Sequence, residues 1–255
     1  SGTSPNVDVG QGTGTGSGLG AGPSVDDFSI SFQGVEGQGK RFVFILDRTK
    51  SGLRVFEKTR TEFLRILDEI ESQPGIEYAL LYFGGDGPGE KHMKGWGVKH
   101  NMLEHDYYVS PHVHPTEDEG EAHDPKWIRP GSSDSDEIVE QINGVDASSK
   151  EFSVKGTQYM GAINAALEMK PQPDQIFIML EARVSTMYNS PDKYSEMLDH
   201  YDDLGGNELG PVPINVIFID HPSVSKESMV ELAKQLNGDK LSDGVIEDFY
   251  TVIEK

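Results

Sequence analysis

Four nearly uninterrupted apolar runs, each about as long as a β-strand, dominate the hydrophobic pattern of this chain. They are Phe42–Leu46, Ile76–Phe83, Ile176–Leu180 and Ile214–Ile219. A strand that faces water on one side alternates apolar and polar residues, whereas a strand covered on both faces does not. The runs therefore predict strands buried on both faces, as in a parallel sheet between layers of helices.

The segments between these runs carry apolar residues at helical spacing. The clearest is Leu53–Ile70, whose apolar stripe faces away from its charged residues. Further helices are expected around Asp136–Ile142 and Met160–Leu167, from Ser190 to about Leu204, and over Ser225–Leu236. Outer strands are expected at Phe28–Phe32, as an edge strand, and at Phe249–Ile253. Buried strands that alternate with amphipathic helices predict an α/β fold with a doubly wound, mostly parallel, Rossmann-like sheet.

Two regions depart from this alternation. Residues 1–26 have no apolar periodicity, and every second residue from Gly10 to Gly22 is glycine, which is typical of a flexible linker or tail. The folded domain is then expected over residues 27–255. Within it, residues 90–136 predict a long irregular insertion that contains six of the eight histidines.

Charge and composition exclude several classes of function. The chain has 22 Lys and Arg against 43 Asp and Glu, a net charge of −21, so nucleic-acid backbones and anionic membranes are repelled. Cations and basic proteins are compatible partners, although a solvated acidic surface explains most of this charge. The absence of cysteine excludes disulfides, thiolate catalysis and cysteine-ligated zinc. No apolar run reaches the roughly 18 residues of a membrane span.

The best candidate for chemistry follows the first buried run. Asp47, Thr49 and Ser51 stand at alternate positions at the end of this predicted strand. Ligands of open α/β sheets bind at the carboxyl ends of the strands, near the point where strand order reverses. A carboxylate and two hydroxyls there suit a small hard cation. The alternative is that these residues only cap the next helix.

Three segments in this order, RFVFILDRTKSG, KGTQYMGAINAAL and DQIFIMLEA, resemble a von Willebrand factor A domain of the bacterial type. The resemblance implies a metal-ion-dependent adhesion site. Asp47, Thr49 and Ser51 match its first motif, with threonine at the middle position, and Thr157 matches its second. Glu181 stands where the family has an aspartate. Glutamate is one methylene longer, and Mg²⁺ tolerates little distortion of its coordination.

The resemblance further implies a non-enzymatic protein-binding or adhesion domain. A divalent cation, Mg²⁺ or alternatively Ca²⁺ or Mn²⁺, would bridge this chain to an acidic residue of a protein ligand. It also implies an extracytoplasmic location, periplasmic or at the cell surface, with a membrane anchor upstream of the glycine-rich linker. A degenerate, metal-free scaffold or assembly domain, with self-association through the tail or an edge strand, is the alternative that the Glu181 replacement leaves open.

Other residues suggest weaker alternatives. The histidines of the insertion are His92, His100, His105, His112, His114 and His123. His112 and His114, together with His105, Glu104, Asp106 or His123, suggest zinc or copper binding and a metal-dependent hydrolase. Their spacing lacks a helical metal motif, and no nucleophile motif accompanies them. Nucleotide binding is disfavoured because no phosphate-loop motif follows a predicted strand. Asp220 and His221 follow a core strand. They are candidate outer partners of the cation; the alternative is that Asp220 only caps the next turn.

Overall fold

The computed structural model describes residues 28–47, 52–83, 98–102, 105–110, 125–145, 159–181, 212–219, 226–237 and 250–253, in places by the backbone alone. The predicted linker over residues 1–26 and the predicted helix from Ser190 to Leu204 lie outside these ranges. The boundaries of the folded domain stay a prediction for the same reason.

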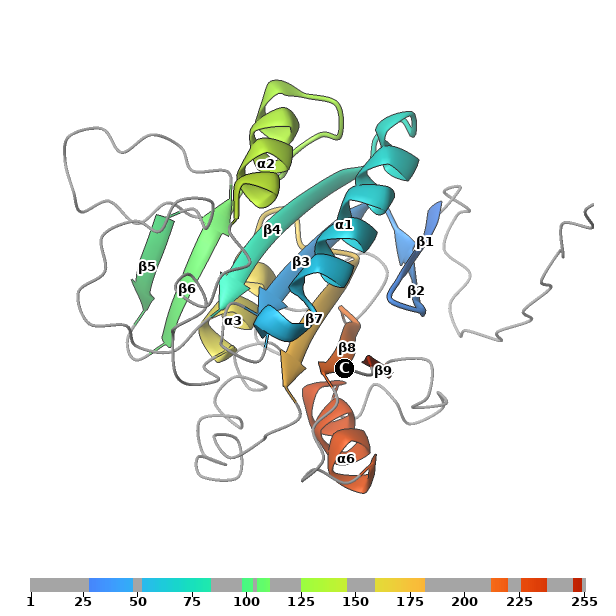
Figure 1. The fold of residues 1–255 in the computed structure, drawn as a ribbon, viewed down its shortest axis with the longest axis vertical. Helices are drawn as coiled ribbons and strands as arrows, with labels where there is room; N and C mark the ends of the chain where they lie inside the picture. Colours follow the sequence, from blue (N-terminus) through green and yellow to red (C-terminus); the bar gives the residue numbers. More distant parts are fainter. Residues whose placement is uncertain are drawn as a thin grey trace, which may run out of the picture.

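A seven-stranded sheet forms the centre of the molecule, in the order β5-β6-β4-β3-β7-β8-β9 (Figure 1). Its strands are β3 (Arg41–Asp47), β4 (Glu77–Phe83), β5 (Val98–Met102), β6 (His105–Ser110), β7 (Gln175–Glu181), β8 (Ile214–Ile219) and β9 (Tyr250–Ile253). The strands β4, β3, β7, β8 and β9 pair in parallel, in that order. At the edge beside β4, the strands β6 and β5 are joined by antiparallel pairing. The predicted α/β fold with a mostly parallel sheet is confirmed.

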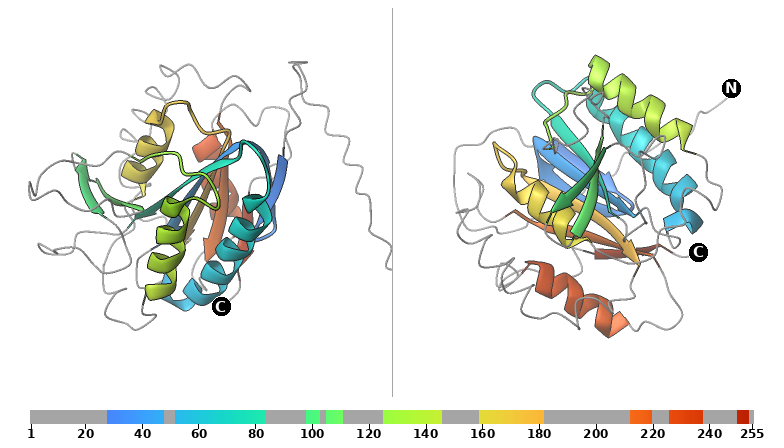
Figure 2. Two further views of the ribbon diagram at one scale, coloured as in Figure 1. Left: turned by 90° about the horizontal axis from the view of Figure 1, so that it is seen from above. Right: turned by 90° about the vertical axis from the view of Figure 1, so that its left-hand side faces the viewer.

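Helices cover both faces of this sheet. Helices α1 (Phe56–Glu71) and α2 (Ser133–Gly144) lie on one face, and α3 (Met160–Glu168) and α6 (Lys226–Asn237) lie on the other (Figure 2). All four helices were predicted, with α2 extending further on both sides than expected. Within the described ranges, no helix is long and apolar enough to cross a membrane.

The side chains of each central strand alternate between the two cores. In β3, Val43 and Ile45 pack towards α3, whereas Phe42, Phe44 and Leu46 pack towards α1. All five are at most 1% exposed. This double burial is the reason that the run contains no polar residue, as the sequence pattern predicts.

The strand Phe28–Phe32 (β1) is correct as a strand, but it does not form an edge of the main sheet. It pairs antiparallel with β2 (Val35–Gly39) in a separate two-stranded sheet. The sequence of β2, VEGQG, carries two glycines, which disfavour strands, and no strand was predicted there. Gly37 is required there because a β-carbon would lie 2.6 Å from the ring of Phe177, so the hairpin approaches the sheet closely.

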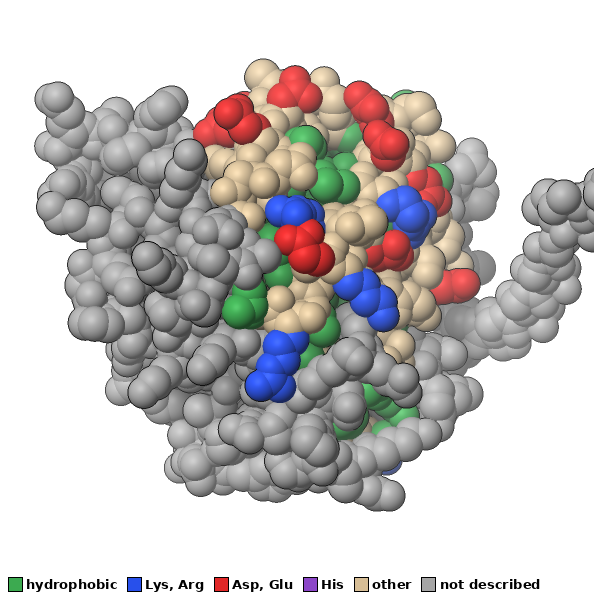
Figure 3. Space-filling model, in the orientation of Figure 1, with side chains coloured by type: hydrophobic (Ala, Val, Ile, Leu, Met, Phe, Trp, Pro, Cys, Tyr) green, Lys and Arg blue, Asp and Glu red, His purple; other side chains and the backbone are tan. Residues whose placement is uncertain are grey.

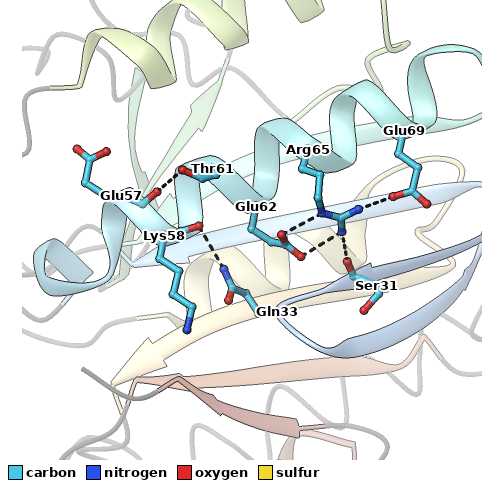
Figure 4. A network of polar contacts seen from close by, with 8 residues as sticks. All are labelled: Ser31, Gln33, Glu57, Lys58, Thr61, Glu62, Arg65 and Glu69. Carbon is cyan, nitrogen blue, oxygen red and sulfur yellow. Dashed lines mark hydrogen bonds and ion pairs between the residues drawn. The ribbon is translucent and has the colours of Figure 1, made fainter. Parts of the chain in front are cut away.

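Arg65 ties this hairpin to α1. Its guanidinium donates to Glu62 at 3.0 and 3.1 Å, to Glu69 at 2.7 Å, and to the main-chain oxygen of Ser31 at 2.8 Å (Figure 4). The two carboxylates raise the pKa of Arg65. The arginine is therefore fully engaged, and it holds β1 against the outer side of the helix.

The prediction of an irregular insertion over residues 90–136 is only partly correct. Residues 98–102 and 105–110 form β5 and β6, which extend the sheet, and Ile128 forms a bridge with Tyr78 of β4. The prediction missed the pairing because the strands are short and half of their residues are polar. Leu53, expected to begin α1, instead lies in a 3₁₀ turn over Gly52–Arg54.

Candidate cation site at the carboxyl edge of the sheet

The order of strands reverses at β3. From β3 the chain passes through α1 to the parallel neighbour β4, and it later returns to β7 on the opposite side of β3. Asp47 is the last residue of β3 and Glu181 the last of β7. Open α/β sheets bind ligands at such a point. The fold therefore places two of the predicted site residues at the ends of neighbouring strands.

Asp47 is buried at this edge. Its exposed fraction is 2%, and it pairs across the sheet with Phe83 of β4. A carboxylate at this depth requires hydrogen bonds or a counter-charge, since its desolvation is costly.

Gly52 approaches Asp47 closely. A β-carbon on Gly52 would lie 2.2 Å from the main-chain oxygen and 3.1 Å from the carboxyl carbon of Asp47. Only glycine fits at this distance, and the sequence analysis did not single it out. Gly52 then opens the 3₁₀ turn, and its oxygen accepts from the amide of Val55 at 3.1 Å.

Asp47 is not the N-cap residue of α1. The N-cap position of α1 belongs to Val55, whose side chain makes no capping hydrogen bond. Thr59, in the first turn of α1, donates its hydroxyl to the oxygen of Val55 at 3.0 Å and lies 3.3 Å from the sulfur of Met179 in β7. The start of α1 is thereby held above β7, close to the end of that strand.

Helix α3 begins at the same edge. Tyr159 precedes its first residue and is 2% exposed. Its ring packs edge-to-face on Phe83 with a centroid distance of 6.0 Å, and Phe83 is the residue paired with Asp47. Thr157 stands two residues earlier in the chain. Neither Tyr159 nor Phe83 was predicted to belong to the site, because as aromatic residues beside apolar segments they resemble ordinary core.

The complete ligand set stays a prediction. Thr49, Ser51 and Thr157 lie outside the described residues, and Glu181 is described only by its backbone. Among the described side chains, no three His, Cys, Asp or Glu residues are grouped as metal ligands. The proposed outer partners Asp220 and His221 also lie outside the described residues.

The histidine alternative is likewise untested. His100 and His105 lie on β5 and β6, where they pair with Tyr107 and Met102 respectively. The other four histidines of the insertion lie outside the described residues.

Comparisons with known proteins add little to this description. No protein-family model matches the chain, and no curated protein matches it. Proximal thread matrix protein 1 from the mussel byssus is 14% identical, with a TM-score of 0.42 over 84% of this chain and 41% of that one. The pilus adhesin SpaC from Lactobacillus rhamnosus GG is 10% identical, with a TM-score of 0.48 over 90% and 31%.

An aerotolerance-related membrane protein from Bacteroides fragilis is 11% identical, with a TM-score of 0.39 over 78% of this chain and 89% of that protein. This chain thus spans less than half the length of the byssus protein and of the adhesin. Likenesses of this degree carry no argument about function, which must come from the residues of the site.

Proposed function

We propose that this chain is a non-enzymatic protein-binding domain that recognises its ligand at the carboxyl edge of the sheet through a divalent cation. Asp47, Thr49, Ser51, Thr157 and Glu181 would hold the cation. The observation that carries the proposal is the position of Asp47 and Glu181 at the carboxyl ends of β3 and β7. These strands are parallel neighbours at the point where the strand order reverses.

The available oxygen atoms suit a hard cation. Carboxylate and hydroxyl oxygens are the ligands that Mg²⁺, Ca²⁺ and Mn²⁺ prefer. Gly52 lies against Asp47, and Thr49 and Ser51 stand between these two residues in the sequence, which supports a compact set of donors. When bound, the cation would supply open coordination positions that accept a carboxylate from a protein ligand.

A binding role is favoured over hydrolysis because the sequence has neither a cysteine nor a G-x-S-x-G motif. Such a domain fits an extracytoplasmic location, tethered by the glycine-rich segment 1–26.

Calorimetric titration of the chelator-treated chain with Mg²⁺, Ca²⁺ and Mn²⁺ tests the proposal. The wild type should bind one ion, and Asp47→Asn should bind none. Asp68→Asn is the control, since it neutralises an exposed carboxylate on α1 outside this edge. A wild type that binds no ion, or an Asp47→Asn variant that binds as the wild type does, would overturn the proposal.

The second half of the proposal is the open coordination position. Acetate serves as a minimal carboxylate probe, and its binding is monitored through the amide chemical shifts of the chain. Acetate should shift residues at the ends of β3 and β7 in the cation-loaded chain and leave them unchanged after chelation. Shifts that are identical with and without the cation would rule out a bridging metal.

A further inference from the structure

A groove separates α1 from α2 on the outer face of the molecule. Its volume is about 520 Å³, and Leu64, Leu67 and Val139 give it an apolar floor. Leu64 and Val139 are half-buried, so part of this apolar surface contacts water. Figure 3 shows hydrophobic side chains between the two helices, with acidic side chains gathered around them.

The rim of the groove is negatively charged. Asp68 and Glu71 line it from α1, and Asp136 lines it from α2. All three are exposed, and none pairs with a basic side chain among the described residues. Helix α2 itself carries four carboxylates and no basic residue. The one ion pair of α2 among the described residues joins Lys126 to Asp134, at 2.8 Å, and leaves the three rim carboxylates without a paired cation in this part of the chain.

Arg65 is the basic residue that lines the groove, and its charge is already compensated. Its guanidinium pairs with Glu62 and Glu69 and donates to Ser31. These contacts draw it towards the hairpin. It cannot serve as an anion-binding residue in the groove without losing two ion pairs.

We propose that this groove binds a cationic amphipathic segment of another protein. Lysine or arginine side chains of the segment would contact Asp68, Glu71 and Asp136, while its aliphatic side chains cover Leu64 and Val139. Helix-in-groove recognition uses this combination of apolar anchors and a charged rim. Complementary charge also speeds the encounter of the two partners.

The same observations disfavour other occupants. A second copy of this chain, with a net charge of −21, would bring like charge to the rim. Nucleic acid and anionic lipid are repelled for the same reason. A free metal ion or a polyamine would satisfy the carboxylates but would leave the apolar floor in contact with water.

This surface is separate from the proposed cation site. The groove lies along the second half of α1, with Glu71 at the end of that helix, whereas Asp47 precedes its start. Because the helix runs antiparallel to the strands, the groove lies towards their amino ends (Figure 1). Binding in the groove should therefore not depend on a divalent cation.

The test uses a fluorescent, end-capped peptide of lysine and leucine, about four helical turns long, with leucine at helical spacing along one face. A peptide of the same composition in scrambled order is its control. Asp68→Asn/Asp136→Asn should weaken binding of the amphipathic peptide about tenfold. Glu36→Gln/Glu168→Gln makes the same change in net charge at exposed positions outside the groove, and should change binding less than twofold.

The apolar floor is tested with Val139→Thr, which keeps the shape of the side chain. This variant should bind the amphipathic peptide more weakly than the wild type does, and should bind spermidine equally well. Amide chemical shifts should move along α1 and α2, and binding should persist after chelation and in Asp47→Asn. The proposal is overturned if both double variants lose binding equally, or if the scrambled peptide or spermidine binds as tightly as the amphipathic one. A dimer whose interface maps to α1 and α2 would overturn it as well.

Discussion

Gly52 lies so close to Asp47 that no side chain fits between them. A β-carbon at Gly52 would stand 2.2 Å from the main-chain oxygen of Asp47 and 2.9 Å from its carbonyl carbon. The obstacle is backbone of the central strand, which cannot rotate away as the end of a flexible side chain can. Position 52 therefore requires glycine beside the end of β3.

Gly52→Ala should destabilise the fold by about 2–4 kcal/mol, since the turn or the end of β3 must shift to admit the methyl group. It should also weaken any cation binding, because the added methyl group would displace the end of β3, which carries Asp47. Urea denaturation measures the first effect and calorimetry the second.

Gly144→Ala is the matched control for this substitution. Gly144 ends α2, and a β-carbon there would meet nothing within 4 Å. Alanine is the better helix former, so stability should rise by up to about 1 kcal/mol. Equal behaviour of the two variants would show that the contact with Asp47 is not what limits position 52.

Glu181 gives the sharpest test of the ligand set. If its carboxylate is a ligand, Glu181→Ala should lower the affinity for Mg²⁺ at least about tenfold, because one charged donor is lost. Glu181→Asp removes the additional methylene and should raise the affinity for Mg²⁺ more than that for Ca²⁺, since Ca²⁺ tolerates a less regular coordination. Calorimetry with each ion makes the comparison. Unchanged affinity in Glu181→Ala would remove this residue from the site.

Continuous apolar runs made the core strands predictable. A run such as Ile214–Ile219 has no exposed face, and its observed bounds are those expected. The spacing of apolar residues likewise located α1, α3 and α6. These elements were predictable because burial dominates their free energy and leaves a direct trace in residue type.

Elements stabilised by pairing rather than by their own pattern were not predictable. The strand β2 is rich in glycine, and its place depends on the ring of Phe177, far along the chain. The strands β5 and β6 pair through their backbones, which residue type does not report. At the candidate site, the order of the strands could be expected, but the close approach of Gly52 to Asp47 is a tertiary contact.

The side chain of Asn237 forms hydrogen bonds with both backbone groups of Ile214 at the start of β8. Its side-chain oxygen accepts from the amide of Ile214 at 2.8 Å, and its side-chain nitrogen donates to the oxygens of Ile214 and Ala233, both at 2.9 Å. Asn237 is 1% exposed. The single amide therefore joins the end of α6 to the core of the sheet.

Asn237→Leu keeps the branched arrangement of the side-chain heavy atoms but leaves three buried backbone groups without these bonds. We expect a loss of about 2–4 kcal/mol in the free energy of unfolding, measured with urea. Lys234→Ala, at an exposed position of the same helix, should change it by less than about 0.5 kcal/mol. A loss below 1 kcal/mol (roughly the net value of one hydrogen bond) in Asn237→Leu would contradict the bridging role.

Tyr78 couples the sheet to α2 through a buried hydroxyl. The residue is 0% exposed, and its hydroxyl forms a hydrogen bond of 2.9 Å with the hydroxyl of Ser135. Burial raises the pKa of Tyr78 to about 12 from its ordinary value of 10.0. The bond to Ser135 opposes this rise, and the charges of Asp134 and Asp136 add to it.

This shift predicts a loss of stability in alkali. Below pH 10 the phenol is neutral in both folded and unfolded chains, so its contribution is fully present. Between pH 10 and 12 the unfolded chain releases the proton first, and the free energy of unfolding should fall by about 2–3 kcal/mol.

Tyr78→Phe removes this group, so the difference between wild type and variant in urea denaturation isolates it from the other tyrosines. The variant should be the less stable protein at neutral pH, since Ser135 loses its partner, and should approach the wild type as the pH rises from 10 to 12. A constant difference across that range would show that the buried hydroxyl ionises as easily as an exposed one.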